Sequence, residues 1–214
     1  MLNILEFNDQ YCPVKVFEHW FEEAKGKEEL PDAFSLATSD NQGRVSNRYL
    51  NYKGIHSDNN SNFFLFVGNF NSLKSQQISE NQNCSMNFFW RRTGRQVRIE
   101  GQCFQMSEEL SDELFHARSQ LSRLASSISS QSSHLKDYAT LQNNFLKSRE
   151  AIENGDVESE FYIDLNTRPE NWGAFGIEPN LFEYFVYGDH RLNMRYQFTR
   201  ETSESTWEGS WLYP

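Results

Sequence analysis

Residues 88–101, with the sequence FFWRRTGRQVRIEG, decide the fold class of this 214-residue chain. The run CSMNFFW (84–90) ends inside this stretch and the alternating run RQVRIEGQCFQM (95–106) begins inside it; both are typical of strands. Arg92, Thr93 and Gly94 lie between the two runs and predict a turn, because turn positions favour glycine. We therefore expect an antiparallel strand pair at this point.

Further strands are expected on both sides of this pair. Before it, residues 33–55 predict a hairpin that turns at residues 40–43, and SNFFLFV (61–67) predicts a third strand. After it, three more strands are predicted at IEPNLFEYFVYG (177–188), RLNMRYQFTR (191–200) and residues 207–214. Because these segments do not alternate with helices in a βαβ order, the sequence favours an antiparallel barrel or sandwich of the α+β class.

Helices are predicted between the strands. Residues 14–24 place Phe17, Trp20, Phe21 and Ala24 on one helical face and acidic side chains on the other. The other segments that favour helix are 71–81, 107–118 and 134–150. By composition, the serine-rich stretch SRLASSISSQSS (122–133) is expected to be a solvated linker, and residues 155–172 an irregular connection.

Composition and charge limit the classes of function. Aromatic residues make up 15% of the chain despite a mean hydropathy of -0.74, which indicates a folded protein. We expect one domain over residues 1–214, with an N-terminal helical segment (1–30), a helical insertion (107–150) and C-terminal strands (172–214). The net charge of -10 argues against a nucleic-acid partner, but a local cluster of arginine and lysine can still bind a small phosphorylated ligand.

Metal, disulfide and membrane chemistry are not expected. Cys12, Cys84 and Cys103 are odd in number and lack metal-ligand spacing, and the five histidines form no paired motif. The first 30 residues carry charge throughout, and no apolar run is long enough to span a bilayer. These features favour a reduced, cytoplasmic protein.

Basic residues at strand positions are the main chemical signal, since the sequence contains no phosphate-binding glycine loop and no GxSxG motif. For each position alone, ordinary charge on a half-exposed strand is the alternative interpretation. Several together indicate a cleft for anionic groups, because arginine can bind phosphate with two hydrogen bonds. The strand positions are Arg48, Lys53, Arg95, Arg98, Arg191 and Arg195, and Lys74 joins them at the start of the helix that follows the third strand.

Six blocks of the sequence occur in the order found in a known family. They are RVSNRYLNYKGI (44–55), NFNSLKSQQISEN (69–81), FFWRRTGRQVRIEG (88–101), ARSQLSRLASSISSQS (117–132), NWGAFGIEP (171–179) and the tail from RLNMRYQF (191–198) to LYP. From about Phe17 to Pro214, the chain resembles the pyridoxamine/pyridoxine 5′-phosphate oxidases. The resemblance implies a mainly β, antiparallel FMN-binding split β-barrel with peripheral helices. It also implies a homodimer that holds FMN in its interface.

The resemblance assigns roles to individual positions. FMN would be bound by Arg48, Lys53, Lys74, Gln96, Gln131, Ser132, Phe185 and Arg195. The phosphorylated B6 vitamer would be bound by Lys53, Arg118, Ser122, Arg191 and Asn193, of which Arg191 and Asn193 would be the catalytic residues and lie over the substrate. Arg118 and Ser122 are four residues apart, so they are expected to share a helical face; a charge at a helix end beside a capping serine is the alternative interpretation.

The chain also departs from the family pattern. Val67-Gly68 replaces Tyr-Thr, Leu73 replaces Arg, and Leu114 replaces a Tyr of the substrate phosphate site. Phe185 replaces Trp, Asn193-Met194 replaces His-Asp, and Trp211 replaces Arg. Because asparagine does not carry a proton near neutral pH, Asn193 changes the chemistry available at the substrate.

Three functions are compatible with this pattern. The first is an oxidase that converts pyridoxamine or pyridoxine 5′-phosphate to pyridoxal 5′-phosphate, with O₂ as acceptor and H₂O₂ as product. The second is an FMN-dependent oxidase of the same fold that acts on another substrate, which Leu114, Asn193 and Met194 would accommodate. The third is a non-catalytic protein that binds flavin or a vitamer phosphate.

Overall fold

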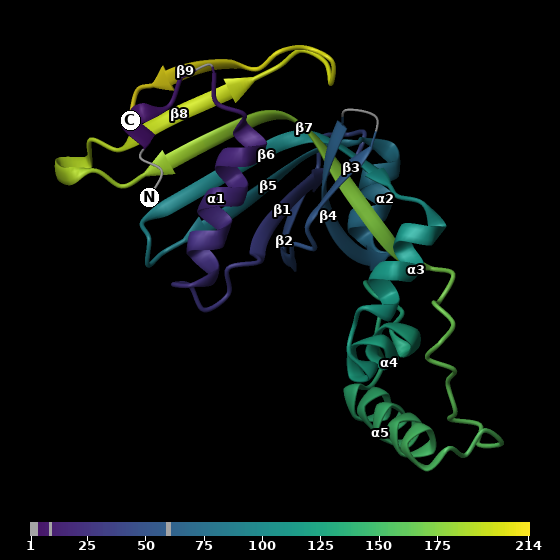
Figure 1. Ribbon diagram of the computed structural model, residues 1–214. Coiled ribbons are helices and arrows are strands. Elements are labelled where there is room, and N and C mark those ends of the chain that lie inside the picture. Colours follow the sequence, from purple (N-terminus) through teal and green to yellow (C-terminus); the bar gives the residue numbers. More distant parts are fainter. Residues whose placement is uncertain (1–3, 9, 59–60) are drawn as a thin grey trace. The chain divides into compact units, whose positions relative to one another are not determined.

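The computed structural model describes residues 4–8, 10–58 and 61–214 (Figure 1). The helices are η1 (Ile4–Glu6), α1 (Pro13–Lys25), α2 (Leu73–Glu80), α3 (Glu108–His116), α4 (Gln120–Ile128), α5 (Tyr138–Asn154) and η2 (Asp189–Arg191). The strands are β1 (Ala33–Ser39), β2 (Val45–Asn51), β3 (Ile55–Asp58), β4 (Ser61–Asn69), β5 (Asn83–Trp90), β6 (Arg95–Gln105), β7 (Trp172–Val186), β8 (Met194–Thr199) and β9 (Glu208–Leu212).

The described strands form one sheet. Their hydrogen-bonded order is β2-β1-β5-β6-β7-β4-β3, and β8 joins β7 to β9. The predicted pair β5 and β6 is antiparallel, with register from Asn83 opposite Gln102 to Trp90 opposite Arg95. Gly94 has a φ of 65° in the turn between them, a conformation that glycine adopts without steric cost. The central strand pair and the first hairpin, β1 with β2, are therefore confirmed.

Helix α1 covers one face of the sheet (Figure 1). Phe17 and Trp20 of α1 are buried, and the Phe17 ring lies 5.1 Å from that of Phe88 on β5. The Trp20 ring lies 5.0 Å from that of Tyr184 on β7, in edge-to-face geometry. The predicted amphipathic helix is thus confirmed, and its apolar face closes the aromatic core.

The chain divides into two compact units. Unit 1 contains residues 1–66, 77–104 and 176–214, and unit 2 contains residues 67–76 and 105–175. Strands β4, β6 and β7 run through both units, as does α2. The single domain expected over residues 1–214 stays a prediction. Its N-terminal segment includes residues 1–3 and 9, which lie outside the described residues.

One predicted connection is wrong. The serine-rich stretch is not a linker, because α4 occupies residues 120–128. The Ser119 hydroxyl caps this helix by accepting a hydrogen bond from the Ser122 N–H, and Leu124 is buried. A cap and one buried leucine make this stretch helical, although its composition resembles that of a linker. Residues 155–171 form an irregular connection, as expected.

The described helices offer no candidate for a membrane-spanning segment, since none is both long and apolar enough.

Candidate functional site

Unit 2 contains a cavity of about 290 Å³. Among the described residues, no carboxylate lines it, while hydroxyl, amide and guanidinium groups do. A cavity rich in hydrogen-bond donors and free of acidic side chains suits an anionic ligand. Its lining residues are Val67, Gly68, Asn69, Arg118, Ala125, Ser126, Ser129, Gln131 and Trp172.

Lys74 and Gln131, both predicted to bind FMN, contact each other, and Gln131 lines this cavity. Lys74 is the second residue of α2 and is buried. Its Nζ donates to Oε1 of Gln131 over 2.7 Å and to Oγ of Ser72 over 2.8 Å. A Cβ atom at Gly68 would lie 2.7 Å from the same Nζ. The missing side chain of Gly68 therefore leaves the space that the Lys74 ammonium occupies.

Arg118 contacts the same cavity, but not as predicted. Helix α3 ends at His116, so Arg118 lies in the link to α4 and does not share a helical face with Ser122. Its Nη1 donates instead to Oγ of Ser126 over 2.6 Å, and its guanidinium lies 4.9 Å from the centroid of the Trp172 ring. Burial lowers the pKa of Arg118 below its ordinary value.

Ser126 and Trp172 were missed by residue-level reasoning from the sequence. Ser126 is eight residues from Arg118, a spacing that no single helix rule connects. Trp172 lies in the block NWGAFGIEP and could have been found from it. Ser122 instead accepts a hydrogen bond from the Ser119 hydroxyl over 2.9 Å. The role predicted for Ser132, which is exposed and has a φ of 70°, stays a prediction.

In unit 1, Arg48 lies on the same sheet face as its β1 neighbour Leu36. Its Nη1 donates to Oγ1 of Thr38 over 2.6 Å, and its Nη2 donates to Oε1 of Gln77 over 3.4 Å. Burial lowers the pKa of Arg48 below its ordinary value. Lys53 is exposed and lies after the end of β2 at Asn51, so its predicted place on that strand is wrong.

Gln96, Phe185 and Arg195 lie on the opposite face of the unit 1 sheet from Arg48. Gln96 stands opposite the exposed Phe89, and Phe185 stands opposite Arg195. Between β6 and β8 lies the buried carboxylate of Glu183, which accepts from Arg195 Nε over 2.8 Å and from Arg98 Nη2 over 2.5 Å. Burial alone would raise the pKa of Glu183, but these hydrogen bonds lower it below its ordinary value.

The predicted substrate residues Arg191 and Asn193 lie in the turn between β7 and β8. Strand β8 begins at Met194, so the strand predicted from residue 191 begins later than expected. Arg191 is exposed with a φ of 66°, in the left-handed region. Oδ1 of Asn193 accepts a hydrogen bond from the Gly188 N–H over 3.3 Å, which ties the turn together.

Comparison with known families identifies the chain. The family model described as pyridoxamine 5′-phosphate oxidase matches residues 21–150. A second model, described as the pyridoxine 5′-phosphate oxidase C-terminal dimerisation region, matches residues 172–214. The chain belongs to the pyridoxamine 5′-phosphate oxidase family. The enzyme class predicted from the sequence, an oxidoreductase of this type, is thereby confirmed.

Curated members of the pyridoxamine 5′-phosphate oxidase family match most of the chain. A pyridoxine/pyridoxamine 5′-phosphate oxidase of Coxiella burnetii is 35% identical, over 90% of this chain and 91% of the relative. One from Pelagibacter ubique is 34% identical, over 97% of this chain and 94% of the relative.

Solved structures confirm the split-barrel fold. PhzG from Burkholderia lata 383, solved with tetrahydrophenazine-1-carboxylic acid, has a TM-score of 0.80 at 27% identity and covers 94% of this chain and 92% of its own. A pyridoxamine 5′-phosphate oxidase-related, FMN-binding protein from Nostoc punctiforme PCC 73102 has a TM-score of 0.74 at 16% identity, covering 97% and 100%. The second likeness supports the fold alone.

Proposed function

We propose that the chain is an FMN-dependent oxidase that converts pyridoxine or pyridoxamine 5′-phosphate to pyridoxal 5′-phosphate, with O₂ as acceptor and H₂O₂ as product. The observation that supports the proposal is the cavity of unit 2: Arg118 and Gln131 line it, no described lining residue carries a carboxylate, and Gln131 accepts a hydrogen bond from Lys74. Both the cofactor and the substrate would present a phosphate, and such groups bind where cations and neutral donors converge.

The types of the residues predicted to bind FMN suit its chemical groups. Lys74, Gln131, Ser132, Arg48 and Lys53 would bind its phosphate and neighbouring groups. Gln96, Phe185 and Arg195 would contact its ring system, since Gln96 can both donate and accept hydrogen bonds. FMN, when bound, supplies the redox chemistry by accepting a hydride from the substrate and returning the electrons to O₂.

The chain's own residues would bind and orient the substrate. Arg118, Ser122 and Lys53 would hold the vitamer phosphate, while Arg191 and Asn193 would lie over the pyridine ring. Because Oδ1 of Asn193 accepts from the Gly188 N–H, its NH₂ group is the part that can donate to a substrate oxygen. Correct orientation lowers the barrier of the hydride transfer by fixing the distance between the reacting atoms.

A homodimer with FMN in its interface is part of this proposal. The match of residues 172–214 to a dimerisation region supports it, as does the position of Phe185 and Arg195 within that range. The exposed aromatic side chains of Tyr49 and Phe89 lie on the same sheet face as Gln96, and exposed aromatic groups are enriched at interfaces.

A second candidate keeps the reaction type and changes the substrate. The likeness to PhzG, with a TM-score of 0.80, favours this candidate, as do Leu114 and Asn193. The resemblance assigns position 114 to the substrate phosphate site, and a site without that tyrosine hydroxyl would bind a less highly charged aromatic substrate more readily.

An anaerobic titration distinguishes the two candidates. The purified protein is loaded with FMN, and the visible flavin absorption is followed while pyridoxine 5′-phosphate and then pyridoxamine 5′-phosphate are added. Bleaching that reverses when air is admitted is expected. If FMN binds and neither vitamer bleaches it, the second candidate replaces the first. If FMN does not bind, the cofactor assignment is wrong.

A further inference from the structure

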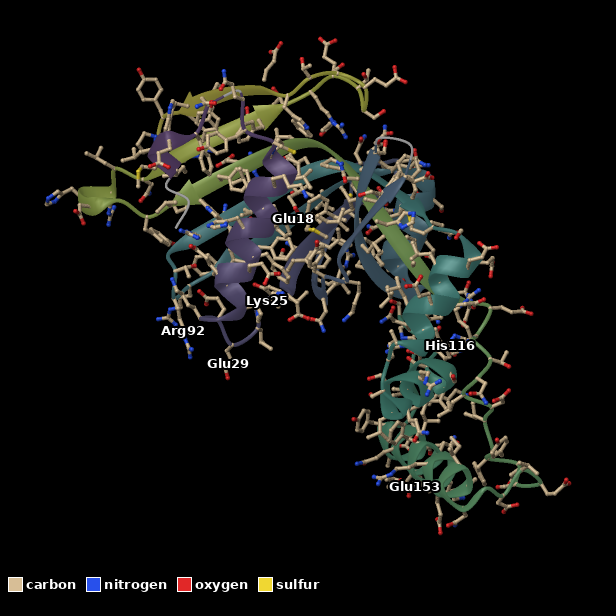
Figure 2. All side chains as sticks on the ribbon, viewed as in Figure 1. Glu18, Lys25, Glu29, Arg92, His116 and Glu153 are labelled. Carbon is tan, nitrogen blue, oxygen red and sulfur yellow. The ribbon has the colours of Figure 1, made fainter. Side chains whose placement is uncertain are left out.

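Residues 155–171 join α5 to β7 and lie outside both matched family ranges, 21–150 and 172–214. Two helical side chains bind the backbone of this segment. Nε2 of His116, at the end of α3 in Figure 2, lies 2.9 Å from the carbonyl oxygen of Asn166. Nη1 of Arg123 on α4 donates to the carbonyl of Leu165 over 3.0 Å. We call residues 155–171 the brace.

Arg168 is the residue of the brace with the most polar contacts. Its side chain is 6% exposed. It donates through Nε to Asp112 over 2.6 Å and through Nη2 to Glu108, both on α3. Burial alone would lower the pKa of Arg168, but these carboxylates raise it. The guanidinium is therefore charged and fixed in orientation by two acids that lie one helical turn apart.

The remaining guanidinium nitrogen of Arg168 binds the first residue of β7. Its Nη1 donates to the carbonyl oxygen of Trp172 over 2.5 Å. The Trp172 ring also packs against the Phe115 ring of α3, which lies 5.3 Å away in edge-to-face geometry. Trp172 is 4% exposed, so both its backbone and its ring are restrained.

The guanidinium of Arg118 lies over the face of this restrained ring. Its guanidinium lies 4.9 Å from the Trp172 centroid, and its Nη1 donates to Ser126. A cation over an indole face is attracted to it, and the attraction depends on the position of the ring. The contacts therefore run from α3 through Arg168 and Trp172 to Arg118 at the cavity, all within unit 2.

We propose that Arg168 is a positioning residue that fixes Trp172 and thereby holds Arg118 at the cavity in the orientation that binds the phosphate of the substrate. This inference rests on the proposed function, since it takes that phosphate as the ligand of Arg118. It assigns a role to the brace, whose sequence carries no catalytic motif.

The first test uses the FMN-loaded protein and inorganic phosphate as the probe. Arg168→Ala is expected to weaken phosphate binding about 10-fold, measured by titration calorimetry, because a misplaced guanidinium loses a charge-assisted hydrogen bond. Arg168→Lys keeps the charge and should recover part of the affinity. Arg149→Ala, which removes an exposed arginine paired with Glu153 on α5, is the matched control and should bind phosphate normally. Should the alanine variant not fold, the lysine variant alone must still bind phosphate more weakly than the unmodified protein.

The second test asks whether Arg168 acts through Arg118. Arg118→Ala should weaken phosphate binding, and adding Arg168→Ala to it should cause no further loss, because coupled residues are not additive. With pyridoxine 5′-phosphate, Arg168→Ala should raise KM and leave kcat within about 2-fold.

Two results would overturn the inference. One is normal phosphate affinity in Arg168→Ala with only a lower melting temperature, which indicates a purely structural role. The other is a double variant whose loss is the product of the two single losses. Failure of the unmodified protein to oxidise either vitamer would instead contradict the proposed function, and the phosphate titrations would remain interpretable.

Discussion

At the scale of single residues, the position of the Lys74 side chain depends on Gly68. The ammonium of Lys74 lies where a side chain at position 68 would begin, and it is bound by Ser72 and Gln131. A lysine on a flexible four-carbon stem can move, so its position depends on these restraints. The loss of the family's threonine at this position therefore removes one hydroxyl and also admits the ammonium.

Gly68→Ala is expected to weaken FMN binding about 10-fold, or ~1.4 kcal/mol. The added Cβ would displace the ammonium from Gln131 and supply no hydroxyl in return. The measurement is a fluorescence titration of FMN. Gly26→Ala is the control, because Gly26 has an ordinary φ of -82° and its Cβ would meet nothing closer than 3.7 Å. Equal affinities in all three proteins would contradict the prediction.

Glu183 is expected to contribute stability that depends on pH. Its pKa is lowered in the folded protein, so its contribution is complete above the ordinary glutamate pKa and is lost as pH falls through the lower, folded-state pKa. At pH 7, Glu183→Gln should lower the free energy of unfolding by about 2 kcal/mol, a value reduced because both arginines are partly exposed.

Urea denaturation at a series of pH values checks this prediction. The difference between the unmodified protein and Glu183→Gln should shrink as pH falls below the ordinary glutamate pKa. Glu153→Gln, in the exposed pair with Arg149, is the control and should change stability little at any pH. A difference that stays constant with pH would show that Glu183 contributes by packing rather than by charge.

At the scale of elements, most strands were predictable, but β3 and α4 were not. Strand pair β5–β6 alternates apolar and polar residues around a glycine turn, a pattern with a single good interpretation. In α4 the composition is dominated by serine, and the signals that make it helical are one capping hydroxyl and one buried leucine. Such a helix depends on its surroundings more than on its own sequence.

Ser119→Ala is expected to destabilise α4 by about 1 kcal/mol, because the N–H of Ser122 loses its capping partner. Hydrogen exchange should become faster in residues 120–128 and remain unchanged in α1. Ser133→Ala, beyond the end of α4, is the control. Unchanged exchange in α4 would indicate that its packing alone maintains it.

The contacts of the cavity could not be read from the sequence for a related reason. Lys74 and Gln131 are 57 residues apart, and Arg118 reaches Ser126 across the link between two helices. The residue types predicted that basic side chains form an anion site, and the resemblance predicted which of them bind each ligand. Neither predicts the hydrogen-bond partner of a side chain. The place of Arg118 on a helix was wrong because the helix end at His116 carries no glycine or proline.

At the scale of the whole molecule, the chain is expected to form a homodimer. Light scattering should give twice the chain mass of 25.2 kDa. Because each chain carries a net charge of -10, two chains repel each other, and moderate salt should tighten the dimer by screening this repulsion. A monomer at every salt concentration would contradict the prediction and the placement of FMN in an interface.

Strand β7 is a part of this chain that cannot gain or lose a residue. Phe182 and Tyr184 are buried in the core, while Glu183, between them, binds the arginines of the other face. Inserting or deleting one residue there would exchange the two sets of side chains, and both the core and the arginine cluster would be lost in a single genetic event. Changes in length are therefore expected in connections such as residues 155–163, where an added residue moves no strand out of register and which precede the backbone contacts at Leu165 and Asn166.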